Sequence, residues 1–244
     1  MNVIAMIPAR LEATRFPRKL LQVLEGKSIL QRTWEKVQHS GLFSQVLVIC
    51  DDQELVQEVK RFGGMARLSS RSYESGTDRI AEFAGEANEN DILINVQGDE
   101  PFIEKEALQL VIGLFQDPRV EIASLMIPIT DEARFRDPNC VKVVCNAEGK
   151  ALYFSRAPIP YHRSESHGLC AFQHVGVYGF RKEALLRFTA LPVSKLEQTE
   201  KLENLRMLEH GFGVYLCPIQ HTGISIDTPE DFERARAWIQ EHPE

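Results

Sequence analysis

The sequence predicts an α/β fold built around a mainly parallel sheet. Two observations lead to this prediction: short apolar runs rich in β-branched residues recur along the first half, and helical patterns separate them. The strand-like runs are VIAMI, QVLVIC, ILINV and IASLMIPI, and the helical patterns cover 28–39, 52–62, 77–88 and 104–116. Strands that alternate with helices are typical of βαβ units, because neighbouring parallel strands need a long crossover connection.

The pattern changes after Val141. The runs VKVVC and KALYFS, joined by the turn sequence NAEG, predict a β-hairpin, and a polar loop at 162–170 follows it. HVGVYGF predicts a further strand, LEQTEKLENLRMLEHG predicts one helix closed by Gly211, and TPEDFERARAWI predicts a last helix. We therefore predict a single domain over 1–244, in which approximately 141–212 form an inserted smaller portion.

Composition and charge exclude several classes of protein. A chain of 244 residues can bury a substantial core without disulfides. The net charge of −7 argues against nucleic acid or an anionic membrane as the main partner. Five cysteines without CxxC spacing suggest neither a zinc site nor a secreted disulfide framework, which favours the reducing cytoplasm. The first segment, NVIAMIPA, lacks a basic leader and is too short to span a membrane.

A basic loop follows the first predicted strand. The stretch IPARLEATRFPRKLL, residues 7–21, places Arg10, Arg15, Arg18 and Lys19 where open α/β sheets present their ligand crevice. Arginine forks engage pairs of phosphate oxygens and lysine acts as a point charge, so this mixture suits a nucleoside triphosphate. The alternative is a solvated basic loop, and the Walker pattern GxxxxGK[ST] is absent.

Two acidic motifs are candidate metal sites. In NVQGDEP, residues 95–101, Asp99 follows a buried strand and should emerge beside the same crevice, where carboxylates can hold Mg²⁺. In SIDTPED, residues 225–231, capping explains Thr228 and Asp231 but leaves Asp227 as a plausible second carboxylate. The alternative for Asp99 and its neighbour Glu100 is a helix start stabilised by the helix dipole.

The motif SGTDRIAE, residues 75–82, predicts a helix start at which Ser75 or Thr77 is the cap and Gly76 allows close backbone approach to a base or ribose. The alternative is an ordinary helix start. Farther along, spacing by three and four residues places Glu200, Glu203 and Asn204 on one face of a predicted helix.

Together these motifs resemble the family of 3-deoxy-manno-octulosonate cytidylyltransferases, also called CMP-KDO synthetases. The segments IPAR, SGTDR, NVQGDEP, KALYFSRAPIP, HVGVY and DTPED occur in the family's order and spacing. The resemblance implies a Rossmann-like nucleotidyltransferase fold with a smaller inserted dimerisation portion. It also implies a reaction in which CTP and an acidic eight-carbon sugar, KDO, give CMP-KDO and pyrophosphate for lipopolysaccharide assembly.

The resemblance also implies roles for individual residues. It assigns Arg10, Arg15 and Lys19 to the triphosphate, with Arg15 and Lys19 acting in catalysis. It assigns Asp99 and Asp227 to Mg²⁺ and to catalysis. The cytidine would lie near Ser75, Gly76, Thr77 and Arg79. The sugar pocket would be formed by Gln97, Lys142, Arg156, His174, Tyr178, Glu200, Glu203 and Asn204. The family forms homodimers, so a homodimer is expected here.

The chain departs from the family pattern at a few positions. It reads PRKLL where the family usually reads PGKPL, so Arg18 replaces a glycine and Leu20 a proline. Asn204 stands where glutamine is frequent and Gln173 where a basic residue is frequent. Three alternatives stay open: the same reaction on 8-amino-KDO or a sialic acid, a glycosyltransferase, whose DxD motif is absent from 95–101, and a nucleotide-binding module without turnover.

Overall fold

The structure is a computed structural model that describes residues 2–13, 15–163, 170–220 and 223–242. Thr14 of the basic loop and residues 164–169 of the predicted polar loop lie outside this description. The chain divides into two compact units, of which the first comprises Met1–Gln109 with Thr222–Glu244 and the second Leu110–His221. The prediction of an insert at 141–212 is not tested by this division. None of the helices in the described ranges combines the length and the apolar character needed to cross a membrane.

The first unit contains a parallel four-stranded sheet in the order β6, β1, β4, β5. Its strands are β1 Val3–Ala9, β4 Gln45–Cys50, β5 Met65–Leu68 and β6 Ile92–Asn95, and a small hairpin is formed by β2 Val23–Leu24 and β3 Lys27–Ser28. β1, β4 and β6 are almost entirely buried, which explains their near-continuous apolar sequence, because helices cover both faces of a parallel sheet.

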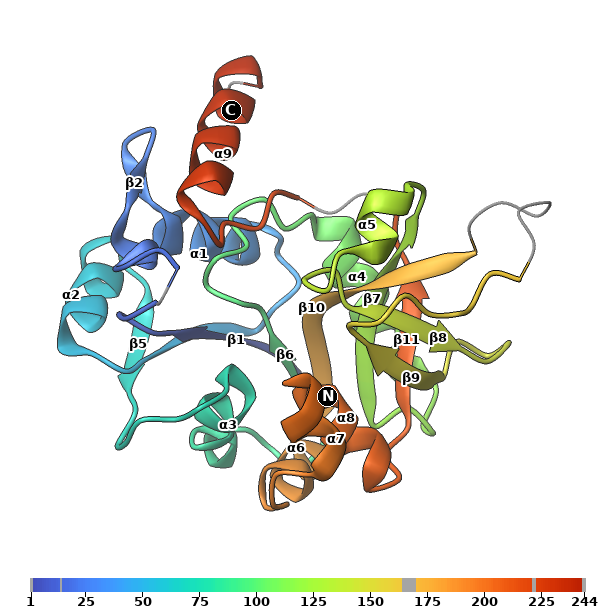
Figure 1. Ribbon diagram of the computed structural model, residues 1–244. Coiled ribbons are helices and arrows are strands. Elements are labelled where there is room, and N and C mark those ends of the chain that lie inside the picture. Colours follow the sequence, from blue (N-terminus) through green and yellow to red (C-terminus); the bar gives the residue numbers. More distant parts are fainter. Residues whose placement is uncertain (1, 14, 164–169, 221–222, 243–244) are drawn as a thin grey trace. The chain divides into compact units, whose positions relative to one another are not determined.

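The helices of the first unit each begin after a capping side chain, and the sequence predicts two of these caps, at Ser75 and Thr228. They are α1 Ile29–His39, α2 Gln53–Arg61, α3 Gly76–Ala81 and α9 Pro229–Glu241, with the 3₁₀ turns η1 Lys19–Leu21 and η2 Ala84–Glu86. Thr228 and Asp231 form the predicted capping box of α9, and Pro229 occupies its first turn. Figure 1 shows α1 and α3 on opposite sides of β1.

The strand order places a ligand crevice in the first unit. From β1 the chain continues to β4 on one side, whereas β6 lies on the other side of β1. The chain therefore leaves the carboxyl ends of β1 and β6 in different directions, which opens a crevice between the two loops. Open α/β sheets bind ligands in such a crevice, where the strand order reverses. The basic loop after β1 and the NVQGDEP motif after β6 both begin there.

The second unit contains a mixed sheet in the order β11, β7, β10, β8, β9, in which only β11 and β7 pair in parallel. The strands are β7 Ile122–Ile129, β8 Lys142–Cys145, β9 Ala151–Ser155, β10 Ala171–Arg181 and β11 Val214–Pro218. The helical elements are η3 Leu114–Gln116, α5 Glu132–Arg136, α6 Lys182–Thr189, α7 Lys195–Glu200 and α8 Glu203–Glu209, and α4 Lys105–Gly113 spans the division between the units. The predicted hairpin is confirmed as β8 and β9.

The prediction of one continuous helix over 196–211 is wrong. The helix breaks at Lys201, which adopts a left-handed backbone conformation with φ of 54°. The Arg156 side chain donates to the carbonyl groups of Glu200, at 2.7 Å, and of Lys201, at 3.4 Å. These contacts from a distant strand end satisfy carbonyls that a continuous helix would use internally. Glu200 and the pair Glu203 and Asn204 therefore belong to different helices.

The prediction of a helix over 77–88 is too long. α3 ends at Ala81, and the amides of Phe83 and Glu86 then bond three residues back, which tightens the chain into the 3₁₀ turn η2. The Glu82 carboxylate accepts the main-chain amide of Ser70 at 2.9 Å. A contact outside the helix thus fixes the residue at which α3 stops.

Candidate active site

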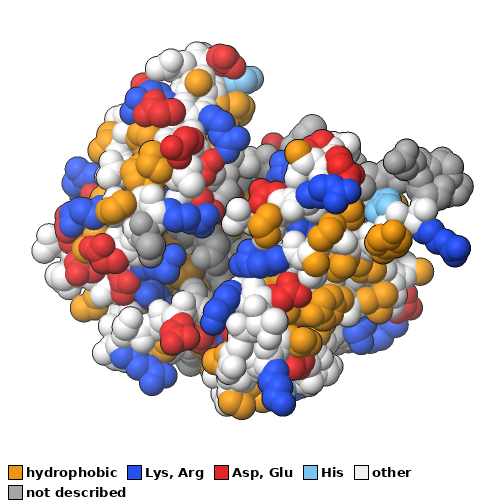
Figure 2. All heavy atoms as spheres, viewed as in Figure 1, with side chains coloured by type: hydrophobic (Ala, Val, Ile, Leu, Met, Phe, Trp, Pro, Cys, Tyr) orange, Lys and Arg blue, Asp and Glu red, His pale blue; other side chains and the backbone are white. Residues whose placement is uncertain are grey.

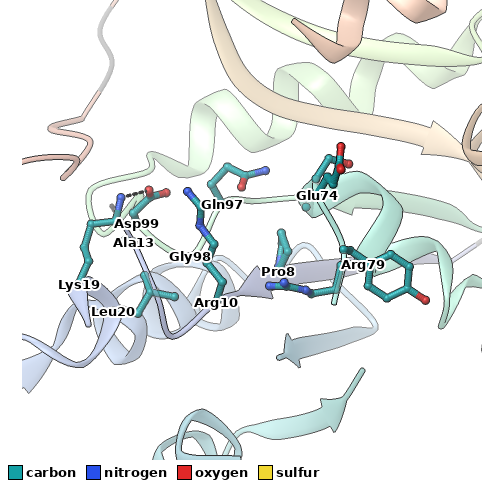
Figure 3. A pocket seen from close by; sticks show the side chains of 13 residues that line it. Pro8, Arg10, Ala13, Lys19, Leu20, Glu74, Arg79, Gln97, Gly98 and Asp99 are labelled. Carbon is teal, nitrogen blue, oxygen red and sulfur yellow. Dashed lines mark hydrogen bonds and ion pairs between the residues drawn. The ribbon is translucent and has the colours of Figure 1, made fainter. Parts of the chain in front are cut away.

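A pocket of about 200 Å³ lies in the first unit at the carboxyl ends of β1 and β6. It is lined by the basic loop after β1, the segment leading into α3 and the start of the NVQGDEP loop (Figure 3). Among the residues predicted from sequence, its lining includes Arg10, Lys19, Ser75, Gly76, Arg79, Gln97 and Asp99. The structure thus brings the phosphate-loop and cytidine motifs to one pocket.

Lys19 connects the two predicted metal carboxylates. Its Nζ lies 2.5 Å from Asp99 Oδ2 and 3.0 Å from Asp227 Oδ1. The sequence separates these carboxylates widely, but the amide of Ile226 donates to the carbonyl of Asp99 at 3.1 Å and holds the two segments together. Arg15 adds a second cation, 3.3 Å from Asp227. The aspartates therefore face one common point at the edge of the pocket.

Opposing effects set the charge of this cluster. Burial acts to lower the pKa of Lys19, but the charges and hydrogen bonds of Asp99 and Asp227 outweigh it, so the pKa is raised and the ammonium is retained. Burial raises the pKa of Glu100 to about 8, and the neighbouring Asp99 carboxylate adds to this effect. Glu100 therefore holds its proton at neutral pH.

The two aspartates fit a hard divalent cation. Among the described residues no group of three histidine, cysteine or acidic side chains converges as a metal centre. Mg²⁺ commonly uses one or two protein carboxylates, with substrate phosphates and water completing its shell. Asp99 and Asp227 already share one cation, the Lys19 ammonium, so their oxygens have the convergence that such a site needs.

The cytidine motif is built on the first turn of α3. Ser75 Oγ accepts the amide of Asp78 at 3.0 Å, which identifies Ser75 as the cap, whereas Thr77 is buried. A Cβ on Gly76 would lie 2.9 Å from the ring of Pro8 and 3.3 Å from Gln97. Only a residue without a side chain lets α3 approach the end of β1 this closely.

Arg79 belongs to the pocket lining, but its side chain is almost entirely buried. Its guanidinium donates to the Ala9 carbonyl at 2.7 Å and pairs with Asp51 at 3.2 Å. Figure 3 shows the Arg79 side chain alongside Pro8, while Arg10 points toward Gln97. Arg10 is therefore the arginine presented to a ligand, and Arg79 lies behind it.

Arg18 is directed away from the pocket lining. Its backbone is left-handed, with φ of 53°, and its guanidinium forms an ion pair with Glu54 in the first turn of α2. Of the four cations of the basic loop, Arg10 and Lys19 line the pocket and Arg15 lies beside Asp227, while their contact with a polyphosphate stays a prediction. Arg18 instead links the loop to α2.

Several predicted sugar-pocket residues in the second unit are engaged in internal contacts. Lys142 is fully buried and donates to three main-chain carbonyls at 2.5 to 2.8 Å, those of Asp137, Cys140 and Arg156. In this arrangement all three donors of its ammonium are used. The Glu200 carboxylate accepts from the Ser155 hydroxyl and the Arg156 amide. These residues join the end of β9 to α7.

A second group in that unit is partly aromatic. His174 Nε2 lies 2.9 Å from Ser124 Oγ, and its ring lies 5.1 Å from that of Tyr178. Burial lowers the pKa of His174 to about 4. Burial, with the charge of Glu203, raises the pKa of Tyr178, whereas a hydrogen bond with Asn204 opposes the rise. Both rings are therefore neutral at physiological pH.

Two residues that shape the pocket were not predicted from the sequence. Asp51 binds Arg79 and accepts the amide of Leu11 at 2.8 Å, and the Thr33 hydroxyl donates to the carbonyl of Gly98 at 2.8 Å. Asp51 directly follows the apolar run of β4, so its place at a strand's carboxyl end could have identified it. Thr33 lies within α1 and gives no comparable signal.

The fold and this site define a nucleotide-binding α/β transferase, and comparisons with known proteins specify the class. The sequence model of the family described as Cytidylyltransferase matches residues 4–219. A Flavobacterium johnsoniae protein named 3-deoxy-manno-octulosonate cytidylyltransferase is 47% identical, over 99% of this chain and 100% of the relative. A protein of the same name from Christiangramia forsetii is 42% identical, over 98% and 97%.

A solved structure agrees with these relatives. CMP:2-keto-3-deoxy-manno-octonic acid synthetase complexed with CTP superimposes with a TM-score of 0.93 at 36% identity, covering 99% of both chains. The chain therefore belongs to the family of 3-deoxy-manno-octulosonate cytidylyltransferases. The predicted α/β fold with a mainly parallel central sheet is confirmed.

Proposed function

We propose that the protein activates KDO with CTP, giving CMP-KDO and pyrophosphate. The observation that carries this proposal is the cluster of Lys19 between Asp99 and Asp227 beside a pocket lined by the cytidine motif. Family membership specifies the substrates, because the similar proteins are named for KDO and the similar structure holds CTP. Supply of an activated sugar for lipopolysaccharide assembly follows from that product.

In the proposed reaction the anomeric hydroxyl oxygen of KDO bonds to the α-phosphorus of CTP. The bond from that phosphorus to the oxygen bridging to the β-phosphate breaks, pyrophosphate leaves with this electron pair, and the hydroxyl proton passes to solvent. Such transfers depend mainly on positioning and charge stabilisation. Lys19, charged and nearly buried, and Arg15 would stabilise the departing pyrophosphate, and Arg10 would orient the triphosphate.

We assign Asp99 and Asp227 as the residues that would hold Mg²⁺. When bound, the metal would neutralise phosphate charge and lower the pKa of the attacking hydroxyl. Lys19 now contacts both carboxylates, and it would keep the pair together before the metal and the nucleotide arrive. The protonated Glu100 beside them adds no further negative charge.

A coupled assay tests this function. Purified protein with CTP, KDO and Mg²⁺ should release pyrophosphate and form CMP-KDO, and a chelator should abolish both. Asp99→Asn should reduce kcat at least about 10²-fold, because charge stabilisation in an active site contributes on that scale. Asp117→Asn, at an exposed ion pair in the second unit, is the matched control. Near-normal turnover by folded Asp99→Asn protein would refute the assignment.

The sugar can be tested separately from the chemistry. We propose KDO rather than 8-amino-KDO or a sialic acid, because the relatives that span this chain are named for KDO. Competing equal amounts of the three pure sugars for limiting CTP, with mass spectrometry of the products, should give CMP-KDO as the main product. A dominant CMP-sialic acid or CMP-8-amino-KDO peak would change the substrate and leave the reaction type intact.

We further propose that the protein is a cytoplasmic homodimer. Hydrophobic side chains gather over the β8 and β9 hairpin in Figure 2, and Leu152 on β9 and Tyr161 after it are 60% and 88% exposed. These positions lie in the segment 141–212, for which dimerisation is expected. All five cysteines are free thiols, as a reducing compartment would leave them. Light scattering at micromolar concentration should give twice the chain mass, and Leu152→Glu should reduce it toward the monomer.

A further inference from the structure

Arg10 is the exposed arginine of the nucleotide pocket, and the backbone on both sides of it is fixed by one buried network. The Ala9 carbonyl accepts from the Arg79 guanidinium at 2.7 Å and from the amide of Asp51 at 3.1 Å. The amide of Leu11 donates to Asp51 Oδ1 at 2.8 Å. The Arg79 guanidinium closes the network by pairing with Asp51 Oδ2 at 3.2 Å.

Both members of the pair are placed by regular structure. Asp51 directly follows β4, which runs beside β1, and Arg79 lies on α3. The Arg79 side chain is 5% exposed and that of Asp51 23% exposed, so solvent screens this pair less than a surface pair. The network thus ties the end of β1 to the end of β4 and to α3.

The geometry requires an arginine at position 79. Its two terminal nitrogens reach different acceptors, the Ala9 carbonyl and the Asp51 carboxylate, and Nε has no hydrogen-bond partner among the described residues. A planar fork can hold two acceptors in a fixed relation, whereas a lysine ammonium is a single point on a flexible chain. Figure 3 shows Arg79 at the base of the pocket while Arg10 points toward Gln97.

We propose that Asp51 and Arg79 are positioning residues, which hold the backbone at Ala9 and Leu11 so that the Arg10 guanidinium is pre-set for CTP. The inference rests on the proposed function, because CTP is taken as the ligand of the pocket. Arg10 is otherwise an exposed side chain on a loop, and fixing its backbone lowers the entropy lost when it binds phosphate oxygens. Asp51 would act only through Arg10.

The first test replaces Asp51 by asparagine. Asp51→Asn keeps an oxygen for the Leu11 amide but removes the charge that holds Arg79. We expect the dissociation constant for CTP, measured by calorimetry without sugar, to rise about tenfold, and kcat at saturating CTP to stay within about twofold. The control is Glu86→Gln, which breaks the exposed ion pair of Glu86 with Arg67, in the same unit. It should leave CTP binding unchanged.

The second test separates positioning from a general structural role. In an Arg10→Ala background, Asp51→Asn should weaken CTP binding by less than about twofold, since its effect passes through Arg10. The same tenfold loss in both backgrounds, or no loss in either, would overturn the proposal. Thermal melting and circular dichroism verify folding of each variant. If Asp51→Asn does not fold, it is replaced by Arg79→Lys, which keeps the positive charge but loses the planar guanidinium. CTP binding by Arg79→Lys is then compared in the wild-type and Arg10→Ala backgrounds.

The outcomes for the inference and for the proposed function are separable. Binding of CTP by the wild-type protein needs no sugar, so the cycle can be completed even if no CMP-KDO is formed, in which case only the proposed function fails. If CMP-KDO is formed but Asp51→Asn binds CTP normally, the positioning inference fails and the function stands.

Discussion

Arg18 stands where the resemblance to the family predicts a glycine. The backbone of Arg18 is left-handed, a conformation that glycine adopts without steric cost. The ion pair with Glu54 supplies an interaction that glycine cannot make. Because both side chains are 47% exposed, this pair offsets only part of the backbone cost.

A pair of substitutions at this residue separates the two effects. Arg18→Gly and Arg18→Ala both remove the ion pair, but only glycine relieves the left-handed backbone. We expect Arg18→Gly to be more stable than Arg18→Ala by about 1 kcal/mol, the lower end of the usual cost of this conformation. Urea unfolding measures the difference. Equal stability of the two variants would show that the left-handed backbone costs the protein nothing.

His174 makes the second unit sensitive to acid. Its pKa is about 4 in the folded protein and near 6.5 in an unfolded chain, so between these values the unfolded state binds a proton that the folded state excludes. Its contribution to stability is therefore constant above about pH 6.5 and declines as the pH falls toward 4. This direction follows from a base whose folded pKa is depressed.

Replacing His174 by phenylalanine should remove this pH dependence. The new ring can keep the contacts with Phe154 and Tyr178, and the Ser124 hydroxyl can still donate to the Val177 carbonyl at 2.8 Å. We expect the melting temperature of His174→Phe to fall less steeply than that of the wild type between pH 6.5 and 4, as measured by calorimetry. Parallel profiles would show that His174 does not control acid sensitivity.

At the scale of elements, the sequence predicts those whose ends are set locally. Thr228 and Pro229 begin α9 as expected, and apolar runs mark the buried strands of the first unit. The ends of α3 and α7 could not be predicted, because Glu82 and Arg156 fix them through contacts with residues distant in the sequence. Helical periodicity carries no information about such contacts.

The segment that carries Asp227 to the site is itself packed tightly. Gly223 lies so close to Phe102 that an added Cβ would approach the Phe102 carbonyl oxygen to 2.4 Å and its Cβ to 2.5 Å. Since the Phe102 backbone cannot simply rotate away, Gly223→Ala should shift the segment that leads to Asp227. We expect a loss of about 1–3 kcal/mol in the free energy of unfolding, typical of overpacking, and slower CMP-KDO formation.

Gly85→Ala is the control for this substitution. A Cβ on Gly85 would meet no atom within 4 Å, so this variant should change unfolding and turnover little. Urea denaturation measures the free energy of unfolding of both variants, and the pyrophosphate assay measures their turnover. Full activity and stability of Gly223→Ala would mean that the segment adapts without moving Asp227.

At the scale of the whole molecule, residue chemistry and strand order predict much of the candidate site in the first unit. Lys19, Asp99 and Asp227 converge as predicted. In the second unit the sequence predicts the role of Lys142 less well. Nothing in the local sequence indicates that its ammonium group donates hydrogen bonds to three main-chain carbonyls. Burial of a lysine depends on the folded surroundings, which the run VKVVC, residues 141–145, does not encode in any simple pattern.

Binding of CTP should therefore stabilise the chain through the first unit. All described residues of the pocket lining belong to that unit, and a ligand at a hundredfold excess over its dissociation constant stabilises the folded state by about 2.7 kcal/mol. For a chain of this size we expect CTP to raise the melting temperature for unfolding of the first unit by about 5–10 °C. Lys19→Ala should lose most of the shift, because the triphosphate would lose its buried cation, whereas Lys105→Ala, an exposed change on α4, should retain it. Differential scanning calorimetry with UTP as the comparison nucleotide measures the effect, and a shift that survives in folded Lys19→Ala protein would place the nucleotide elsewhere.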